Sequence, residues 1–186
     1  MLYRFDVNLT EQDYYEFNRF HLFTSHYGKK QFEKIRILTS VIPLILFILR
    51  FASYVLSGFA AENLAVCIVY ILLSVFLFFI SKPLVWFISK LQIKQMKKQG
   101  KLPFTPDSTL EFYDDSFVEI TPDNKTESKY SLVDSIYIVN GKMIYIFTNS
   151  VLAYMLPVKV FESEEQYNSF MDFITEKTKP AIIVDR

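Results

Sequence analysis

The chain has 186 residues, 51% of them hydrophobic, and its 20 basic and 20 acidic side chains give a formal net charge of zero. The charge is unevenly placed: residues 29–101 sum to +9 (11 basic, 2 acidic), residues 102–186 to −7 (7 and 14) and residues 1–28 to −2 (2 and 4). The acidic carboxy-terminal segment argues against nucleic acid as a partner, because phosphate is bound by Lys and Arg. The single cysteine, Cys67, excludes an internal disulfide.

The sequence carries no recognisable catalytic motif. Its four glycines form no phosphate-binding loop, and its cysteine and two histidines do not have the spacing of a zinc site. His21 and His26 lie five residues apart instead of the four of a metal pair, so we interpret them as surface or packing residues. Asp114 and Asp115 are adjacent, and such neighbours point apart, so they are interpreted as turn residues. We therefore expect no enzyme activity and no cofactor.

The amino-terminal segment is predicted to hold a strand and an aromatic helix. Tyr3–Leu9 alternates apolar and polar residues, as a half-buried strand does. Thr10 followed by Asp13 is typical of a capping box, so a helix should begin near Glu11. Its many aromatic rings favour packing over a ligand groove, because aromatic side chains bury so much area. Gly28 is expected to break this helix.

Two apolar runs, residues 35–56 and 64–82, lie a few residues apart. About 20 helical residues cross the hydrocarbon of a bilayer, and neither run has the polar face of a soluble helix. They predict a transmembrane hairpin, the alternative being two buried core helices. Arg50 either extends its side chain to the outer interface or acts as an intramembrane functional charge, facing an oligomer interior or Glu62.

Basic residues flank both runs, whereas the short link between them carries only Glu62. Cytoplasmic flanks retain Lys and Arg, so both termini should be cytoplasmic. After Pro83 the chain is expected to bend and to follow the inner interface as an amphipathic helix. Anionic lipid head groups are the expected partner there, at about 1 kcal/mol per basic residue. The residues assigned to this membrane-surface contact are Lys82, Trp86, Lys90, Lys94, Lys97 and Lys98.

From Thr109 the hydrophobic period changes to two, which predicts a meander of short antiparallel strands. Asn140-Gly141 is the strongest hairpin motif. Ser163, three residues before Gln166, predicts the cap of a final helix. Strands followed by one closing helix are the order of a pleckstrin-homology-like (PH-like) split β-barrel. The six predicted strands are 110–112, 117–120, 126–130, 135–139, 143–147 and 151–156.

The same region carries a family resemblance. The succession Leu110-Glu111-Phe112-Tyr113-Asp114-Asp115, then Tyr130 to Ile136, Tyr145-Ile146, and Ala153-Tyr154-Met155-Leu156-Pro157 with Phe161 before a capped helix resembles the YcxB-like family of bacterial membrane proteins. The two spans and the aromatic amino-terminal segment fit it too. Ser116 stands where the first hairpin of that family usually turns with glycine. The resemblance implies a PH-like cytoplasmic domain on a membrane hairpin, and it implies no catalytic residue.

Together these observations predict an α+β membrane protein of the bacterial inner membrane, multi-pass, with both termini cytoplasmic. Its expected segments are a strand and helix (1–34), a transmembrane hairpin (35–88), a basic juxtamembrane helix and linker (89–103) and an antiparallel PH-like split β-barrel closed by a carboxy-terminal helix (104–186). Because both ends share one compartment, the strand Tyr3–Leu9 can add to the carboxy-terminal sheet.

We expect a membrane-anchored, cytoplasmic-facing binding or regulatory protein whose partner is another protein or a second copy of itself. One alternative is a transport-related or self-protection (immunity-type) membrane protein that acts through an oligomer of its hairpins. A membrane enzyme is the third alternative.

Overall fold

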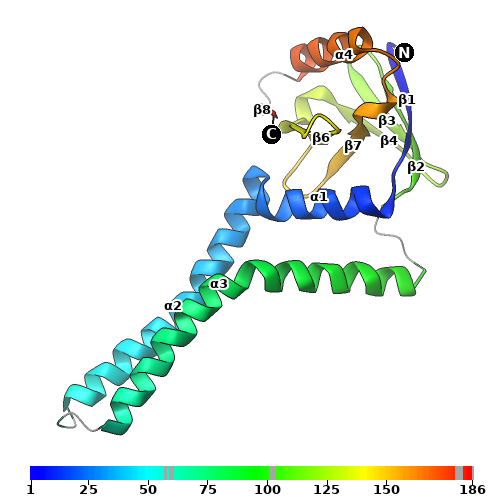
Figure 1. Ribbon diagram of the computed structural model, residues 1–186. Coiled ribbons are helices and arrows are strands. Elements are labelled where there is room, and N and C mark those ends of the chain that lie inside the picture. Colours follow the sequence, from blue (N-terminus) through cyan, green and yellow to red (C-terminus); the bar gives the residue numbers. More distant parts are fainter. Residues whose placement is uncertain (57, 59–60, 101–103, 179–181, 186) are drawn as a thin grey trace. The chain divides into compact units, whose positions relative to one another are not determined.

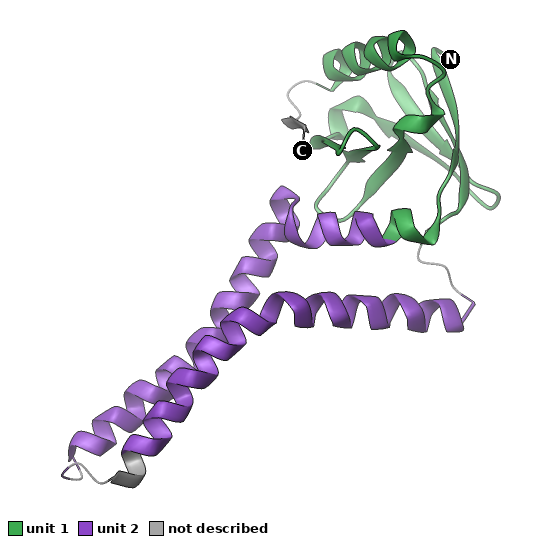
Figure 2. Ribbon diagram, viewed as in Figure 1, with its two compact units in different colours: residues 1–14, 104–186 green, residues 15–103 purple. Residues whose placement is uncertain are grey.

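The computed structural model describes the backbone of residues 1–56, 58, 61–100, 104–178 and 182–185, and the side chains of these residues except 61–63 and 182–185. The predicted linker residues Lys101 and Pro103 lie outside the described residues. The chain forms two compact units (Figure 2): unit 1 comprises residues 1–14 and 104–186, and unit 2 comprises residues 15–103.

The fold class is α+β, as predicted, with two long apolar helices, antiparallel sheets and a carboxy-terminal helix (Figure 1). The helices are α1 (Glu11–Phe23), α2 (His26–Leu56), α3 (Ala61–Lys98) and α4 (Glu164–Lys177), with short 3-10 turns η1 (Tyr130–Leu132) and η2 (Val158–Val160). The strands are β1 (Tyr3–Asn8), β2 (Asp107–Phe112), β3 (Ser116–Ile120), β4 (Lys125–Lys129), β5 (Ser135–Val139), β6 (Met143–Phe147), β7 (Ala153–Pro157) and β8 (Ile182–Asp185).

The strands of unit 1 form two four-stranded sheets, in the orders β1-β2-β3-β4 and β7-β6-β5-β8. All pairs are antiparallel except β5 with β8. β1 pairs with β2 in register Phe5↔Leu110, although residues 9–106 lie between them, which confirms that the amino-terminal strand joins the carboxy-terminal sheet. No strand pair joins the two sheets within the described part of the chain, so no closed barrel is found.

Several predicted strand boundaries differ from the structure. β2 begins at Asp107, three residues before its predicted start, and two boundaries of other strands are displaced for a clear physical reason. Tyr130 belongs to η1 instead of β4, and its buried hydroxyl donates a hydrogen bond of 2.7 Å to the carbonyl oxygen of Tyr113. Val151 and Leu152 precede β7, because the Oδ1 atom of Asn149 accepts hydrogen bonds from both of their N–H groups and holds them in a loop. The hairpin at Asn140-Gly141 is confirmed, since both residues have the positive φ that its turn requires.

The core of unit 1 is aromatic. Phe112, Phe117 and Phe170 are fully buried, and Phe5 on β1 lies within 4.7 Å of Phe161 and 5.2 Å of Phe170 between ring centroids. Tilted and edge-to-face rings of this kind add to the stability gained from buried area. A strand from the amino terminus therefore completes a core that is otherwise built by residues after 104.

In unit 2 the predicted break at Gly28 is wrong, because the helices separate at Thr24-Ser25 and Gly28 lies inside α2. Ser25 replaces the expected glycine stop: its hydroxyl donates to the carbonyl oxygen of His21 (2.8 Å) and accepts from the N–H of Gly28 (3.1 Å). A Cβ atom on Gly28 would lie 1.6 Å from that His21 oxygen. Glycine is thus needed here for close approach of two backbones and not to end a helix.

Helices α2 and α3 are long and apolar enough to cross a membrane. Only 11% of the most apolar stretch of each is buried, which disfavours the alternative of two core helices of a soluble protein. α3 changes direction once along its length (Figure 1), and it contains Pro83, the kind of residue that bends a helix by removing a backbone hydrogen bond. Gly100 follows the end of α3 with a φ of 70°, the left-handed conformation in which a glycine commonly ends a helix.

Candidate functional site

Small and polar side chains line the contact between α2 and α3. The hydroxyl of Ser74 donates to the carbonyl oxygen of Ser40 (2.7 Å), a hydrogen bond that joins the two helices. Ser40, Pro43 and Cys67 are buried, and Cys67 acts here as a small packing residue. Such residues let two helix backbones approach closely, and a hydroxyl can satisfy a carbonyl that water does not reach.

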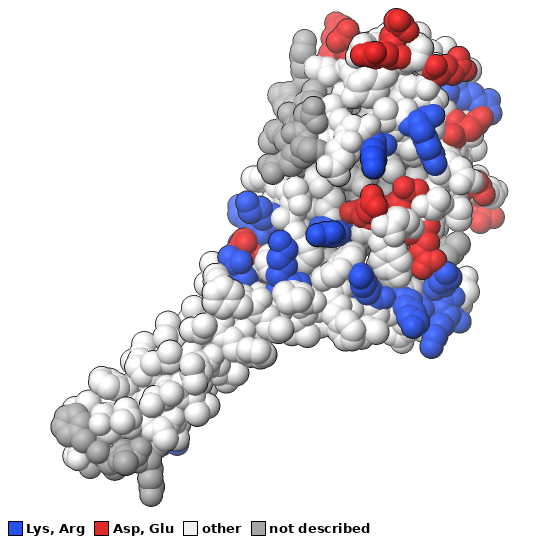
Figure 3. All heavy atoms as spheres, viewed as in Figure 1, with Lys and Arg blue, Asp and Glu red and all other residues white. Residues whose placement is uncertain are grey.

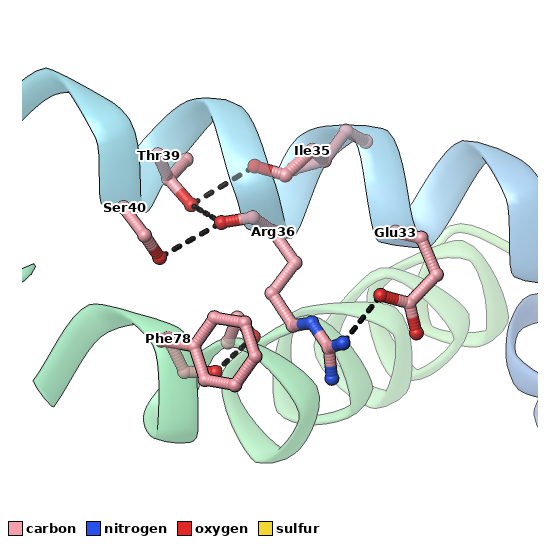
Figure 4. Close-up of polar contacts among 7 residues, drawn as sticks. Glu33, Ile35, Arg36, Thr39, Ser40 and Phe78 are labelled. Carbon is pink, nitrogen blue, oxygen red and sulfur yellow. Dashed lines mark hydrogen bonds and ion pairs between the residues drawn. The ribbon is translucent and has the colours of Figure 1, made fainter. Parts of the chain in front are cut away.

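Arg36 lies against this contact and is not a free basic charge (Figure 4). Its guanidinium pairs with Glu33 on the preceding turn of α2 and stacks over the ring of Phe78 on α3, with Cζ 4.3 Å from the ring centroid. Its Nε is buried and has no hydrogen-bond partner among the described residues. Sequence reasoning counted Arg36 among the basic residues at the start of the first span, although the i, i+3 spacing of Glu33 and Arg36 could have indicated an ion pair.

The predicted membrane-surface residues all lie on α3. Lys90, Lys94, Lys97 and Lys98 are exposed. Lys82 lies over the ring of Phe23, with Nζ 5.3 Å from the centroid, and Lys90 lies over Trp86 at 5.0 Å. On the face shown in Figure 3 the apolar stretch of the hairpin is almost uncharged.

An apolar stripe accompanies these lysines. Leu84, Phe87, Ile88 and Leu91 follow the i, i+3, i+4, i+7 spacing of one helix face, and each is between 44% and 58% exposed. Ile93, by contrast, is buried. The segment of α3 after Pro83 therefore has one exposed apolar face next to exposed lysines, which is the composition of a helix lying in a membrane interface.

Arg50 is exposed on α2, and the described residues include no ion-pair partner for it. The side chain of Glu62, its predicted alternative partner, lies outside the described residues. The role of Arg50 stays a prediction.

Sequence reasoning missed a polar network on the outer face of the β1–β4 sheet. The hydroxyl of Tyr113 donates to Glu111 (2.7 Å), and Glu111 also lies 3.6 Å from the Arg4 guanidinium. The hydrogen bond to Glu111 raises the pKa of Tyr113 above its ordinary value. A network of this kind has no short sequence motif, because strand pairing brings its members together from positions far apart in the chain.

A cavity of about 590 Å³ lies beside this network, and Tyr113, Asp114, Asp115, Ser116 and Glu127 are among its lining residues. Asp114 and Asp115 lie between β2 and β3, which confirms them as turn residues. Lys177 of α4 donates a hydrogen bond to Asp114 and holds the pKa of that carboxyl below its usual range. The described residues contain no group of three or more His, Cys, Asp or Glu side chains placed to hold a metal ion.

The two units define a class of protein: an α+β chain in which two helices of membrane-spanning length precede a β-rich module closed by a helix. Residues 112–174, which run from the end of β2 into α4, match the family model described as YcxB-like protein. The match confirms the predicted resemblance. Searches among curated proteins and among solved structures found no match.

Proposed function

We propose that this chain is a membrane-anchored binding or regulatory protein whose unit 1, a PH-like domain, works at the cytoplasmic face of the bacterial inner membrane. The order of elements supports the PH-like assignment, because four strands, then three strands, then one closing helix follow one another along unit 1. β8 is an addition to that order.

The observation that carries the proposal is the insertion of unit 2 between two paired strands. β1 and β2 are neighbours in one sheet, and the chain leaves unit 1 after residue 14 and returns at residue 104. With unit 2 in a bilayer, both connections tie unit 1 to the membrane surface. Such tethering raises the effective concentration of unit 1 for anything else held at that surface.

The distribution of lysines along α3 supports a cytoplasmic location for unit 1. The lysines of α3 are exposed and follow its apolar stretch directly, which is the distribution of a cytoplasmic flank. Anionic lipid head groups bind this part of α3 through Lys82, Trp86, Lys90, Lys94, Lys97 and Lys98. The apolar stripe beside the lysines sinks into the head-group boundary.

A protein partner binds unit 1 at the edge of its sheet. β4 is the last strand of its sheet, so one row of its backbone groups is unpaired within the described residues. Lys125 and Lys129 mark this edge and are exposed. An edge strand can accept an extended segment of another chain.

The test is photocrosslinking in cells with the full chain. A photoreactive residue replaces Lys125 or Lys129 on β4, and Glu165, exposed on α4, is the matched control position. We expect a discrete crosslinked protein from β4 and none from position 165. We also expect this product to disappear from a variant in which a Gly/Ser linker replaces residues 15–103. The same background at all three positions would contradict the proposal.

A second candidate function, transport or self-protection through an oligomer of hairpins, is favoured by the exposure of Arg50 on an apolar helix. In that case Arg50→Leu disperses the oligomer in mild detergent, whereas Arg50→Lys, which keeps the charge, preserves it. Equal oligomeric states of the three proteins by native mass spectrometry would reject this candidate.

A further inference from the structure

Unit 1 hides nearly all of its large apolar side chains. Among its described residues, those that are exposed are the terminal Met1 and Leu2, together with Leu132 (58% exposed), Val151 (72%) and Leu152 (50%). The last two are adjacent in the loop between β6 and β7. Loops normally present polar residues to water, so two neighbouring exposed apolar side chains need an explanation.

Hydrogen bonds within the loop hold its backbone in place. Oδ1 of Asn149 accepts hydrogen bonds of 2.8 Å from the N–H groups of Val151 and Leu152, and the N–H of Thr148 donates to the carbonyl oxygen of Leu152 (3.1 Å). Three N–H groups of the loop, those of Thr148, Val151 and Leu152, are thereby satisfied within the loop itself. A tip of this kind can leave water without leaving these groups unpaired.

Leu132 belongs to the same end of the second sheet. It lies two residues before Asp134, whose N–H donates to the carbonyl oxygen of Phe147, the residue that leads into the loop. Residues 147–153 contain no charged side chain. Residues of the loop itself therefore include no acidic group that a negatively charged membrane surface would repel.

The position of the β6–β7 loop within unit 1 indicates which surface it contacts. Figure 2 shows the β6–β7 loop and the start of α1 at the same end of unit 1. The chain leaves unit 1 there at Tyr14 and returns at Phe104, and the rings of these two residues stack with centroids 5.0 Å apart. Both connections to unit 2 thus start from the end that carries Val151 and Leu152.

From these observations we infer that the β6–β7 loop is a second membrane contact, which inserts Val151 and Leu152 into the head-group boundary of the cytoplasmic leaflet. The inference rests on the proposed function, because it requires unit 2 to lie in the bilayer. The loop adds no charge-based recognition. It fixes which end of unit 1 faces the lipid.

The test uses the full chain with Cys67→Ala, reconstituted in vesicles of phosphatidylethanolamine and phosphatidylglycerol. An environment-sensitive fluorophore is attached to a single cysteine: Val151→Cys in the loop, Lys142→Cys on the β5–β6 turn as an exposed control, or Leu46→Cys in α2. We expect lipid-borne nitroxide to quench positions 151 and 46 at least twofold more than position 142, and iodide in the buffer to quench position 142 most.

The position in α2 separates two kinds of failure. If position 46 lies in lipid but position 151 is quenched by iodide as strongly as position 142, the loop inference is wrong and the membrane anchor stands. If iodide also quenches position 46, both fail. In a further variant labelled through Ser150→Cys, the double substitution Val151→Asn and Leu152→Asn should abolish quenching by the lipid nitroxide. Unchanged quenching would overturn the inference.

Discussion

Phe5 packs the amino-terminal strand β1 into the core of unit 1. Its ring, 3% exposed, packs among Phe112, Phe161 and Phe170, which stand more than a hundred positions later in the chain. Phe5→Ala should destabilise unit 1 by about 3–5 kcal/mol, the usual cost of a cavity left by a buried aromatic ring. The measurement is thermal unfolding of the detergent-solubilised chain by near-ultraviolet circular dichroism.

The matched control is Leu2→Ala, since Leu2 is 55% exposed and just outside β1. It should change the free energy of unfolding by no more than about 0.5 kcal/mol. If both variants melt alike, β1 does not complete the core.

Glu119 is predicted to make unit 1 sensitive to pH. It is half-buried on β3, and burial raises the pKa of its carboxyl above the ordinary 4.5. The folded chain therefore binds the carboxyl proton of Glu119 more tightly than the unfolded chain does. The stabilisation of the fold by this proton is fully present below pH 4.5 and is lost as the pH rises through the raised pKa of the folded chain. Glu119→Gln should raise the melting temperature at pH 7 and flatten the pH dependence above 4.5. If the melting temperatures of the two proteins change with pH in parallel, this prediction is contradicted.

Among the helices, α4 offers the clearest test of local sequence rules. The hydroxyl of Ser163 accepts a hydrogen bond of 3.2 Å from the N–H of Gln166, whose side chain accepts one from the N–H of Glu162. α4 also places Phe170 and Ile174 in the core. Ser163→Ala should cost about 1 kcal/mol in chemical denaturation, whereas Ser163→Asp, which can still cap the helix, should cost much less. Equal losses would exclude the cap as the cause.

Local sequence rules correctly predicted the features that depend only on residues close together in the chain, such as helix caps and hairpin turns. Thr10 and Asp13 bond each other's N–H groups, as the capping box before α1 required, and Asn140-Gly141 turns the β5–β6 hairpin. The break at Gly28 was predicted wrongly. The reason is that the hydroxyl of Ser25 bonds the backbone carbonyl of His21 at the end of α1. Gly28 is needed instead because a Cβ atom there would collide with the same carbonyl.

For the whole molecule, the sequence predicted the apolar pair of helices, the strands after residue 109 and the addition of β1 to their sheet. It did not predict the division into two sheets, because the η1 turn at Tyr130 depends on a hydrogen bond to Tyr113, in the turn after β2. Nor did it predict β8, whose pairing with β5 joins segments far apart in the chain. The contact of Arg36 with Phe78 was not predicted for the same reason. Hydrophobic periodicity shows which face of a helix a residue occupies, but it does not show which residue of another helix lies opposite.

The central claim is that α2 and α3 cross the membrane with unit 1 inside the cell, and cysteine labelling of intact cells tests it most directly. In a Cys67→Ala background, Ser57→Cys stands between the two spans and Asp123→Cys stands on the exposed β3–β4 turn of unit 1. With a membrane-impermeant maleimide, we predict labelling of position 57 in intact cells and of position 123 only after permeabilisation. Labelling of position 123 in intact cells, with position 57 protected, would contradict the account.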